Sequence, residues 1–167
     1  MEDAETKFLA ATRPAGEFSR MTGISQDTLR DWRKRDMFAG YGAPLPNGYW
    51  GYSMEDAMKV HIAKDFTEAG FEWRDALWIG NVVGGYLTGA SLYKGTRGGK
   101  HYEAKYLAFY HAKKGERPEH RTGDDLSFIV QRAFEGYAPS VVHVVDLHWT
   151  FINLPDQFRN SLVALEG

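Results

Sequence analysis

Apolar residues in positions 16–35 follow a helical spacing that is interrupted by one glycine. The side chains expected to face inward around this interruption are Phe18, Met21, Ile24, Leu29 and Trp32. Gly23 can adopt the positive φ of a tight turn at little cost, and Ser25 can cap the next helix by accepting a hydrogen bond from a backbone N–H near Thr28. The pattern therefore predicts two short helices around a tight turn.

Residues 38–52 break this periodicity, because aromatic residues there flank a stretch rich in glycine and proline. Such a composition favours turns, and it predicts two short strands joined by a loop. Ser53 and Asp56 then have the spacing of a capping box, which predicts a helix reaching to about Ala69. A further helix is expected over residues 72–87.

Glycine becomes frequent from residue 88 onward, and we interpret residues 88–101 as a loop or hinge. The elements expected beyond it are a strand at 102–111, a polar turn-rich stretch at 112–123, a helix at 124–137, a strand at 140–153 and a last helix from 154. The expected fold class is therefore α+β. The expected parts are a flexible lead-in (1–15), a winged helix-turn-helix domain (16–87) and a small α+β domain for dimerisation or effector binding (88–167).

The 167 residues include no cysteine, and the formal net charge is −2. The lack of cysteine excludes disulfides and thiolate zinc sites, and it is compatible with a reducing cytoplasm. No apolar run approaches the ~18 residues that suggest a membrane span, and the acidic start of the chain lacks the basic-then-apolar order of a secretory signal. We therefore expect a cytoplasmic protein without a membrane partner.

The sequence contains neither Gly-x-Ser-x-Gly nor His-Glu-x-x-His, two motifs typical of catalytic centres. We therefore expect no enzyme activity, no catalytic residue and no cofactor. His143, Asp146 and His148 would be metal ligands if they converged, but alternation along one strand places His143 on the face opposite to the other two. No metal site is predicted. Residues 88–167 could bind a small-molecule effector, but no residue pattern supports one.

A helix-turn-helix lets its second helix enter the major groove of DNA, which is wide enough to admit it. The residues expected in or beside the groove are Ser25, Gln26, Thr28, Arg30 and Arg33. The residues expected to hold phosphates or to make the contact of the hairpin are Arg20, Lys34, Asn47 and Tyr49. Trp50 could reach DNA or could pack the hairpin onto the helices, and the second use is favoured.

Several segments of the chain resemble the winged helix-turn-helix domain of MerR-type regulators. These segments are Gly16-Glu17-Phe18-Ser19-Arg20, Thr22-Gly23-Ile24-Ser25, Thr28-Leu29-Arg30, Gly48-Tyr49-Trp50-Gly51-Tyr52-Ser53 with the acidic pair Glu55-Asp56, and Ala69-Gly70-Phe71. The resemblance covers about residues 16–80. Trp50 stands where the family pattern has an arginine, and the glycine-rich segment at 88–101 replaces the long helix through which that family dimerises.

The resemblance implies sequence-specific binding of double-stranded DNA by a bacterial or phage transcriptional regulator. We expect a homodimer, because two recognition helices about 34 Å apart would read a palindrome. The last helix is the expected dimer interface, through Phe158, Leu162 and Leu165.

Two other functions remain open from the sequence. One is an architectural or packaging DNA-binding protein, of the excisionase or small terminase subunit type. The other is a protein-interaction module derived from a helix-turn-helix, which the net acidity favours. In that case the basic residues Arg30, Arg33, Lys34 and Arg35 would form a solvated face. They would be paired with Asp27, Asp31 and Asp36.

Overall fold

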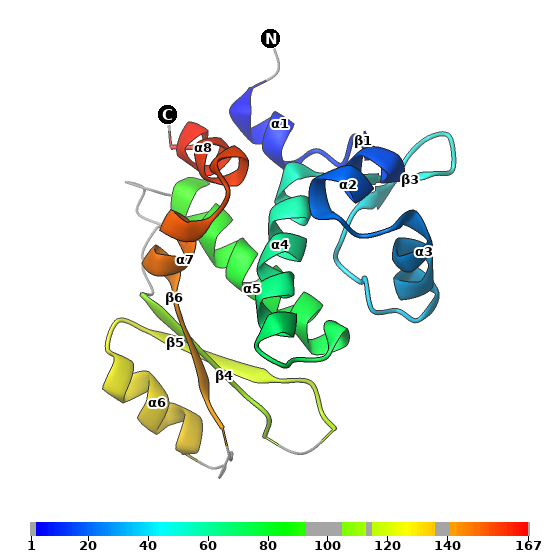
Figure 1. The fold of residues 1–167 in the computed structure, drawn as a ribbon. Coiled ribbons are helices and arrows are strands. Elements are labelled where there is room, and N and C mark those ends of the chain that lie inside the picture. The colour runs from blue at the N-terminus through cyan, green and yellow to red at the C-terminus, as the bar shows by residue number, and fades with distance from the viewer. Residues whose placement is uncertain (1–2, 93–104, 113–114, 136–140, 167) are drawn as a thin grey trace. The chain divides into compact units, whose positions relative to one another are not determined.

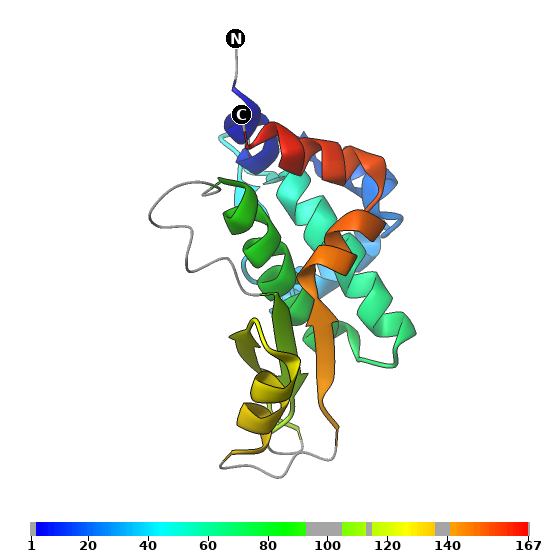
Figure 2. The same cartoon turned by 90° about the vertical axis from the view of Figure 1, so that its left-hand side faces the viewer.

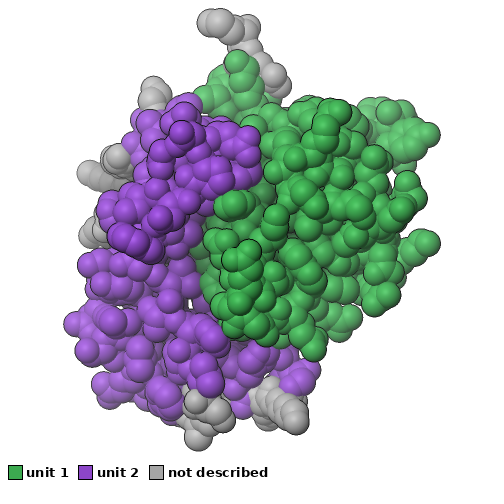
Figure 3. Space-filling view, viewed as in Figure 1, with its two compact units in different colours: residues 1–85, 167 green, residues 86–166 purple. Residues whose placement is uncertain are grey.

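The computed structural model describes residues 3–92, 105–112, 115–135 and 141–166. Within these residues the fold is α+β, as expected, with helices and two small antiparallel sheets (Figure 1). The chain divides into two compact units, residues 1–85 with 167 and residues 86–166, which Figure 3 colours separately. The division falls within helix α5 (Trp73–Leu92), two residues before the boundary expected from the composition.

The first unit combines helices with a three-stranded antiparallel sheet in its described residues, in the order β1-β3-β2. Its elements in chain order are α1 (Ala4–Leu9), β1 (Arg13–Pro14), α2 (Ala15–Thr22), α3 (Gln26–Lys34), β2 (Ala43–Pro44), β3 (Trp50–Tyr52), α4 (Met54–Glu68) and the first part of α5. In the sheet Arg13 lies opposite Tyr52, and Ala43 lies opposite Gly51. The two strands and loop expected within residues 38–52 are confirmed as β2, β3 and the segment between them.

The segment before residue 16 is not the loose lead-in that was expected. Asp3 caps α1 by accepting a hydrogen bond from the Thr6 N–H at 2.7 Å, and the side chain of Phe8 is only 2% exposed. Helix α1 packs against α4, and β1 pairs with β3. The expectation was wrong because a two-residue strand has no periodicity of its own and exists only through its partner strand.

The turn between α2 and α3 forms as the apolar spacing predicted. Gly23 has a φ of +72°, and its N–H donates to the Ser19 carbonyl at 2.9 Å. Ser25 Oγ accepts a hydrogen bond from the Thr28 N–H at 3.1 Å. These two hydrogen bonds end one helix and begin the next.

An aromatic core joins these helices to the segment that follows them. Phe18 stacks on Tyr52 with ring centroids 4.2 Å apart, and Phe38 stacks on Tyr41 at 4.4 Å. Trp32 of α3 contacts Phe38 at 5.5 Å. All of these rings are at most 4% exposed. Because buried aromatic pairs stabilise beyond the area they bury, they hold residues 38–52 in place although only short strands form there.

The expected capping box is confirmed at the start of α4. Ser53 Oγ accepts from the Asp56 N–H at 2.9 Å, and Asp56 Oδ2 accepts from the Ser53 N–H at 2.8 Å. Helix α5 approaches α4 closely at Gly80, where a Cβ would lie 2.4 Å from the Lys59 carbonyl oxygen. Only glycine allows this approach of the two backbones.

The second unit contains, among its described residues, a three-stranded antiparallel sheet in the order β5-β4-β6. Its elements after the last part of α5 are β4 (Tyr106–Tyr110), β5 (Glu119–Gly123), α6 (Leu126–Phe134), β6 (His143–Asp146), α7 (Leu147–Asn153) and α8 (Asp156–Ala164). Helix α6 packs on β4 and β5, beside which it lies in Figure 2. Its buried side chains are Ile129 and Ala133, and a Cβ on Gly123 would lie 2.5 Å from Ile129.

Three segments of this unit differ from expectation. Residues 88–92, expected as the start of a loop or hinge, form the end of α5. The stretch at 112–123 ends in strand β5, which pairs along its whole length with β4. The strand expected at 140–153 stops at Asp146, because Asp146 Oδ1 accepts from the Trp149 N–H at 2.9 Å and starts α7. This local hydrogen bond competes successfully with the strand pattern. Residues 93–104, which contain most of the expected hinge, lie outside the described residues.

Candidate nucleic-acid interface

Helix α3 is anchored on one side and open to solvent on the other. Leu29 and Trp32 are 2% and 4% exposed and fix the inner side. Gln26 and Arg30 are exposed, as is Asp27 between them in sequence. The outward face of α3 is therefore free to contact another molecule, as the helical spacing predicted.

The two hydroxyl groups expected to face DNA are engaged with each other. Ser25 Oγ and Thr28 Oγ1 lie 2.8 Å apart in a hydrogen bond, and Ser25 Oγ also caps the helix. Ser25 is exposed and Thr28 is half-buried. Either hydroxyl can donate in their mutual hydrogen bond. When Thr28 donates, Ser25 accepts both of its bonds to Thr28 and keeps its own O–H to donate to a phosphate or a base while it caps α3.

Two arginines of this region pair with acidic residues of the same segment. Arg30 Nη1 lies 2.7 Å from Asp27 Oδ1, and Arg35 Nε lies 3.0 Å from Asp31 Oδ1. The Arg30 and Asp27 side chains are 70% and 87% exposed. Exposed pairs of this kind contribute little free energy, so a phosphate or a base can replace the carboxylate. The solvated arrangement considered from the sequence is thus present at these two arginines.

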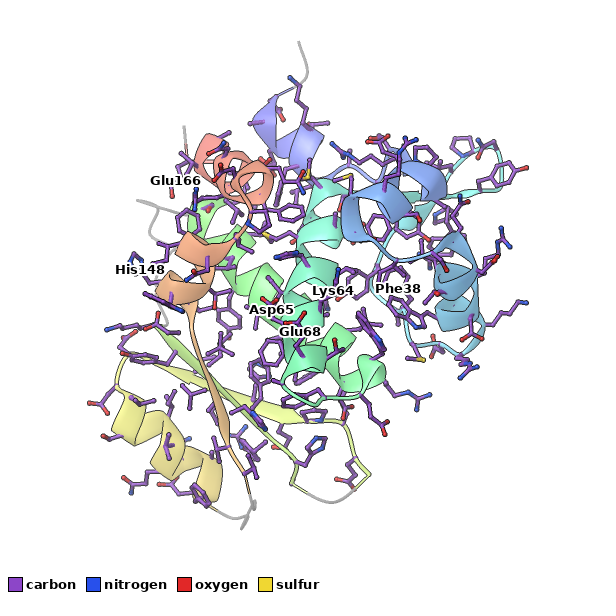
Figure 4. All side chains as sticks on the ribbon, in the orientation of Figure 1. Phe38, Lys64, Asp65, Glu68, His148 and Glu166 are labelled. Carbon is purple, nitrogen blue, oxygen red and sulfur yellow. The ribbon has the colours of Figure 1, made fainter. Side chains whose placement is uncertain are left out.

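Arg33 does not face outward in the free protein, so its expected contact in the major groove stays a prediction that would require the following contacts to break. Its Nε donates to the Tyr52 hydroxyl at 3.2 Å, and its Nη2 donates to the Tyr41 carbonyl at 2.7 Å. The guanidinium carbon lies 3.5 Å from the centroid of the Trp50 ring and 5.2 Å from that of Phe38, which is labelled in Figure 4. These contacts turn the long side chain away from the outer face of α3 and toward the hairpin.

The Trp50 contact confirms that this residue packs the hairpin onto the helices, the favoured use. Trp50 is 40% exposed, so one part of the ring covers Arg33 while the rest meets solvent. Tryptophan offers the best ring for a cation–π interaction, and arginine is its more frequent cation partner in proteins. Trp50 of the hairpin therefore contacts an arginine of α3.

The loop of the hairpin, residues 45–49, is the second exposed part of this surface, and we call it the hairpin tip. Asn47 Oδ1 accepts from the Tyr49 N–H at 3.1 Å, and Gly48 supplies a φ of +80°. Tyr49 is 73% exposed, and Asn47 is exposed as well. Both side chains expected to contact DNA from the hairpin are thus accessible.

Arg20 near the end of α2 and Lys34 at the end of α3 are also exposed. Both charges are accessible at the surface, as a contact with phosphates requires. Their contact with DNA stays a prediction.

Three long-range hydrogen bonds that hold this surface together were not recognised from the sequence. Asp56 Oδ2 accepts from the Gly42 N–H at 3.1 Å in addition to its capping bond. The Tyr41 hydroxyl donates to the Leu77 carbonyl at 2.6 Å, and Lys64 Nζ (labelled in Figure 4) donates to the Thr22 carbonyl at 3.3 Å. Each joins segments distant in sequence, and no local pattern signals such a bond.

Burial shifts the pKa values of two of these residues, Asp56 and Tyr41. Burial raises the pKa of Asp56, although hydrogen bonds from Ser53 and Gly42 and the charge of Lys59 act in the opposite direction. Burial likewise raises the pKa of the Tyr41 hydroxyl well above its usual range, and the charge of Asp56 adds to this effect. Tyr41 is therefore a neutral donor at physiological pH.

The expected dimer interface is not supported at two of its three residues. Phe158 and Leu162 are 1% and 0% exposed within the single chain, and Leu165 is half-buried. A buried side chain leaves no surface for a second copy, so Phe158 and Leu162 belong to the interior. The apolar stripe of α8 was correctly recognised, but it packs within the chain.

The histidines and aspartate of the expected strand at 140–153 do not share one element. Asp146 ends β6 and caps α7, and His148 (labelled in Figure 4) lies on α7. No group of three or more possible metal ligands gathers among the described residues. None of the helices described here combines the length and the apolar character needed to cross a membrane.

No protein-family model matches the chain, and no curated protein matches its sequence. Function must therefore be argued from the surface formed by α3 and the hairpin.

Proposed function

We propose that residues 15–70 form a winged helix-turn-helix that binds double-stranded DNA in a sequence-dependent manner, as MerR-type domains do. The observation that carries the proposal is the exposed outer face of α3. This helix buries Leu29 and Trp32 and leaves Gln26 and Arg30 in solvent. Glutamine can read adenine and arginine can read guanine through two hydrogen bonds each in the major groove.

The hairpin supports the same proposal. Its tip carries Asn47 and the 73% exposed Tyr49 on the segment that follows α3. A tip of this kind can contact the DNA backbone or the minor groove while the helix occupies the major groove. In this arrangement Arg20 and Lys34 would contact phosphates, which position the protein without reading sequence.

A transcriptional regulator acting as a homodimer is the role we propose for such a domain. Two copies of α3 spaced by one turn of DNA would recognise a palindromic site. The contact between the copies must lie elsewhere than at Phe158 and Leu162, because both are buried within the chain.

The decisive experiment compares two arginines that are matched in charge and setting. Arg30→Ala and Arg35→Ala each remove one exposed arginine paired with an aspartate of α3. After a duplex is selected from a random pool, Arg30→Ala is expected to weaken binding to it by about 1–3 kcal/mol and to relax the preference at one base pair. Arg35→Ala removes the same charge at a residue to which no base contact is assigned, so any loss should be equal for selected and random duplexes.

Titrations at several salt concentrations distinguish this function from a protein-interaction module. The pairing of Arg30 and Arg35 with Asp27 and Asp31 favours that second function, since it reduces the uncompensated positive charge of α3. DNA binding through phosphates gives an affinity that falls steeply with salt. Absence of any duplex binding at low salt would exclude the proposed function.

A further inference from the structure

The hairpin has little secondary structure of its own to hold its tip. Strands β2 and β3 comprise only Ala43–Pro44 and Trp50–Tyr52. The loop between them is closed by the Leu45 N–H, which donates to the Tyr49 carbonyl at 2.7 Å, and by the Gly48 N–H, which donates to the Leu45 carbonyl at 2.9 Å. A hairpin this short is only marginally stable in water, so its position depends on the pairing of β3 with β1 and on side-chain contacts with the rest of the unit.

Arg33 supplies such a contact from helix α3. Its hydrogen bonds to the Tyr52 hydroxyl and the Tyr41 carbonyl fix the guanidinium, and the Trp50 ring lies over it at 3.5 Å. Trp50 directly follows Tyr49, which is 73% exposed at the hairpin tip. A contact that fixes Trp50 therefore also fixes where the tip begins.

We propose that the stack of Arg33 on Trp50 is a brace that sets the distance between the hairpin tip and the outer face of α3. Arg33 and Trp50 are then positioning residues, and Tyr49 and Gln26 make the contacts that depend on them. This inference rests on the proposed function for its consequence in DNA binding, but the brace itself is a property of the free protein.

A direct phosphate contact by Arg33 fits the surroundings less well. The hollow beside its guanidinium, with a volume of about 280 Å³, is also lined by Asp36. A carboxylate at this place repels a phosphate. The hydrogen bonds to Tyr41 and Tyr52 already engage Nε and Nη2 of Arg33.

The first test is made on the free protein by NMR of the Arg33 Nε–H group. In the wild type this proton should be shifted upfield by the Trp50 ring and should exchange slowly, because it donates to Tyr52. Trp50→Ala should abolish the upfield shift, and Trp50→Phe should retain part of it. Arg33→Lys removes the group altogether, and it should loosen the hairpin because lysine cannot stack and form both hydrogen bonds. An unchanged Arg33 resonance in Trp50→Ala would overturn the brace.

The second test is a double-mutant cycle on duplex binding with Tyr49 and Trp50. If Trp50 positions the tip, Trp50→Ala should weaken binding about tenfold, and Tyr49→Ala should then cause less than about a twofold further loss. Trp50→Phe should restore most of the affinity. Full additivity of the two losses would show that Trp50 does not act through the tip.

The two tests separate the two proposals. If the wild-type protein binds no duplex, the proposed function fails, and the Arg33 resonance still decides whether the brace exists. Melting curves of Trp50→Ala and Trp50→Phe establish that each variant is folded before either result is used.

Discussion

One oxygen of Asp56 joins the hairpin segment to helix α4. Oδ2 accepts from the buried Ser53 N–H at 2.8 Å and from the half-buried Gly42 N–H at 3.1 Å. Asp56→Ala leaves both donors without this acceptor. A buried donor left unsatisfied costs about 1–3 kcal/mol, and the Gly42 N–H, which water can reach in part, adds less. We expect the free energy of unfolding to fall by about 2–4 kcal/mol.

Urea unfolding followed by circular dichroism and tryptophan fluorescence measures this loss. Asp56→Asn retains one acceptor oxygen and should lose roughly half as much. Asp3→Ala removes an exposed cap that accepts only the Thr6 N–H, so it serves as a control with a smaller effect. A loss below about 1 kcal/mol for Asp56→Ala would refute the reasoning, because water would then satisfy both donors.

The raised pKa of Asp56 gives the same experiment a pH dependence. Burial raises this pKa above 3.8, its ordinary value, so the folded state takes up the proton at a higher pH than the unfolded state does. Stability from this group is therefore present at low pH and lost as pH rises through the raised pKa. Relative to Asp56→Asn, the wild type should gain stability as pH falls toward 3.8, and a constant difference would contradict the burial effect.

Two further predictions concern the helices and the second unit. Gly80→Ala should lower the free energy of unfolding by about 1–3 kcal/mol, since its Cβ would meet the Lys59 carbonyl oxygen at 2.4 Å. Gly85→Ala on the same helix meets nothing within 4 Å, so thermal melts should show no loss and up to about 1 kcal/mol of gain. Burial lowers the pKa values of His120 and His143 below 6.5; as pH falls below that value the unfolded state binds more protons, so stability should decrease. The double variant with glutamine at both positions should show a flatter pH profile in chemical unfolding, and an equally steep one would contradict this assignment.

The parts of the fold that were predictable depend on interactions between neighbours in sequence. The turn at Gly23, the cap at Ser25 and the capping box of Ser53 and Asp56 each use groups within four residues of one another. Their residue types therefore carry the signal directly. The same holds for the apolar side of α8, whose burial the spacing indicated although its partner was misassigned.

Strand β5 and helix α7 are elements that the local sequence pattern did not predict. Strand β5 is polar in sequence and exists because it pairs with β4. Alternation continued beyond Asp146, yet the chain became helical there, since the Leu147 N–H donates to the Lys105 carbonyl and Asp146 caps the next turn. Pairing with a distant segment therefore decided the first outcome, and a local cap that overrides the alternation decided the second.

The candidate site likewise contains residues whose exposure the sequence predicted and one residue, Arg33, whose role it did not. The sequence by itself determined that α3 exposes Gln26 and Arg30, because helical spacing fixes which positions share a face. Only the tertiary structure decided the role of Arg33, whose flexible side chain extends toward whichever partner is closest. That partner is Trp50, and the hairpin is brought there by aromatic packing between segments that no local pattern relates.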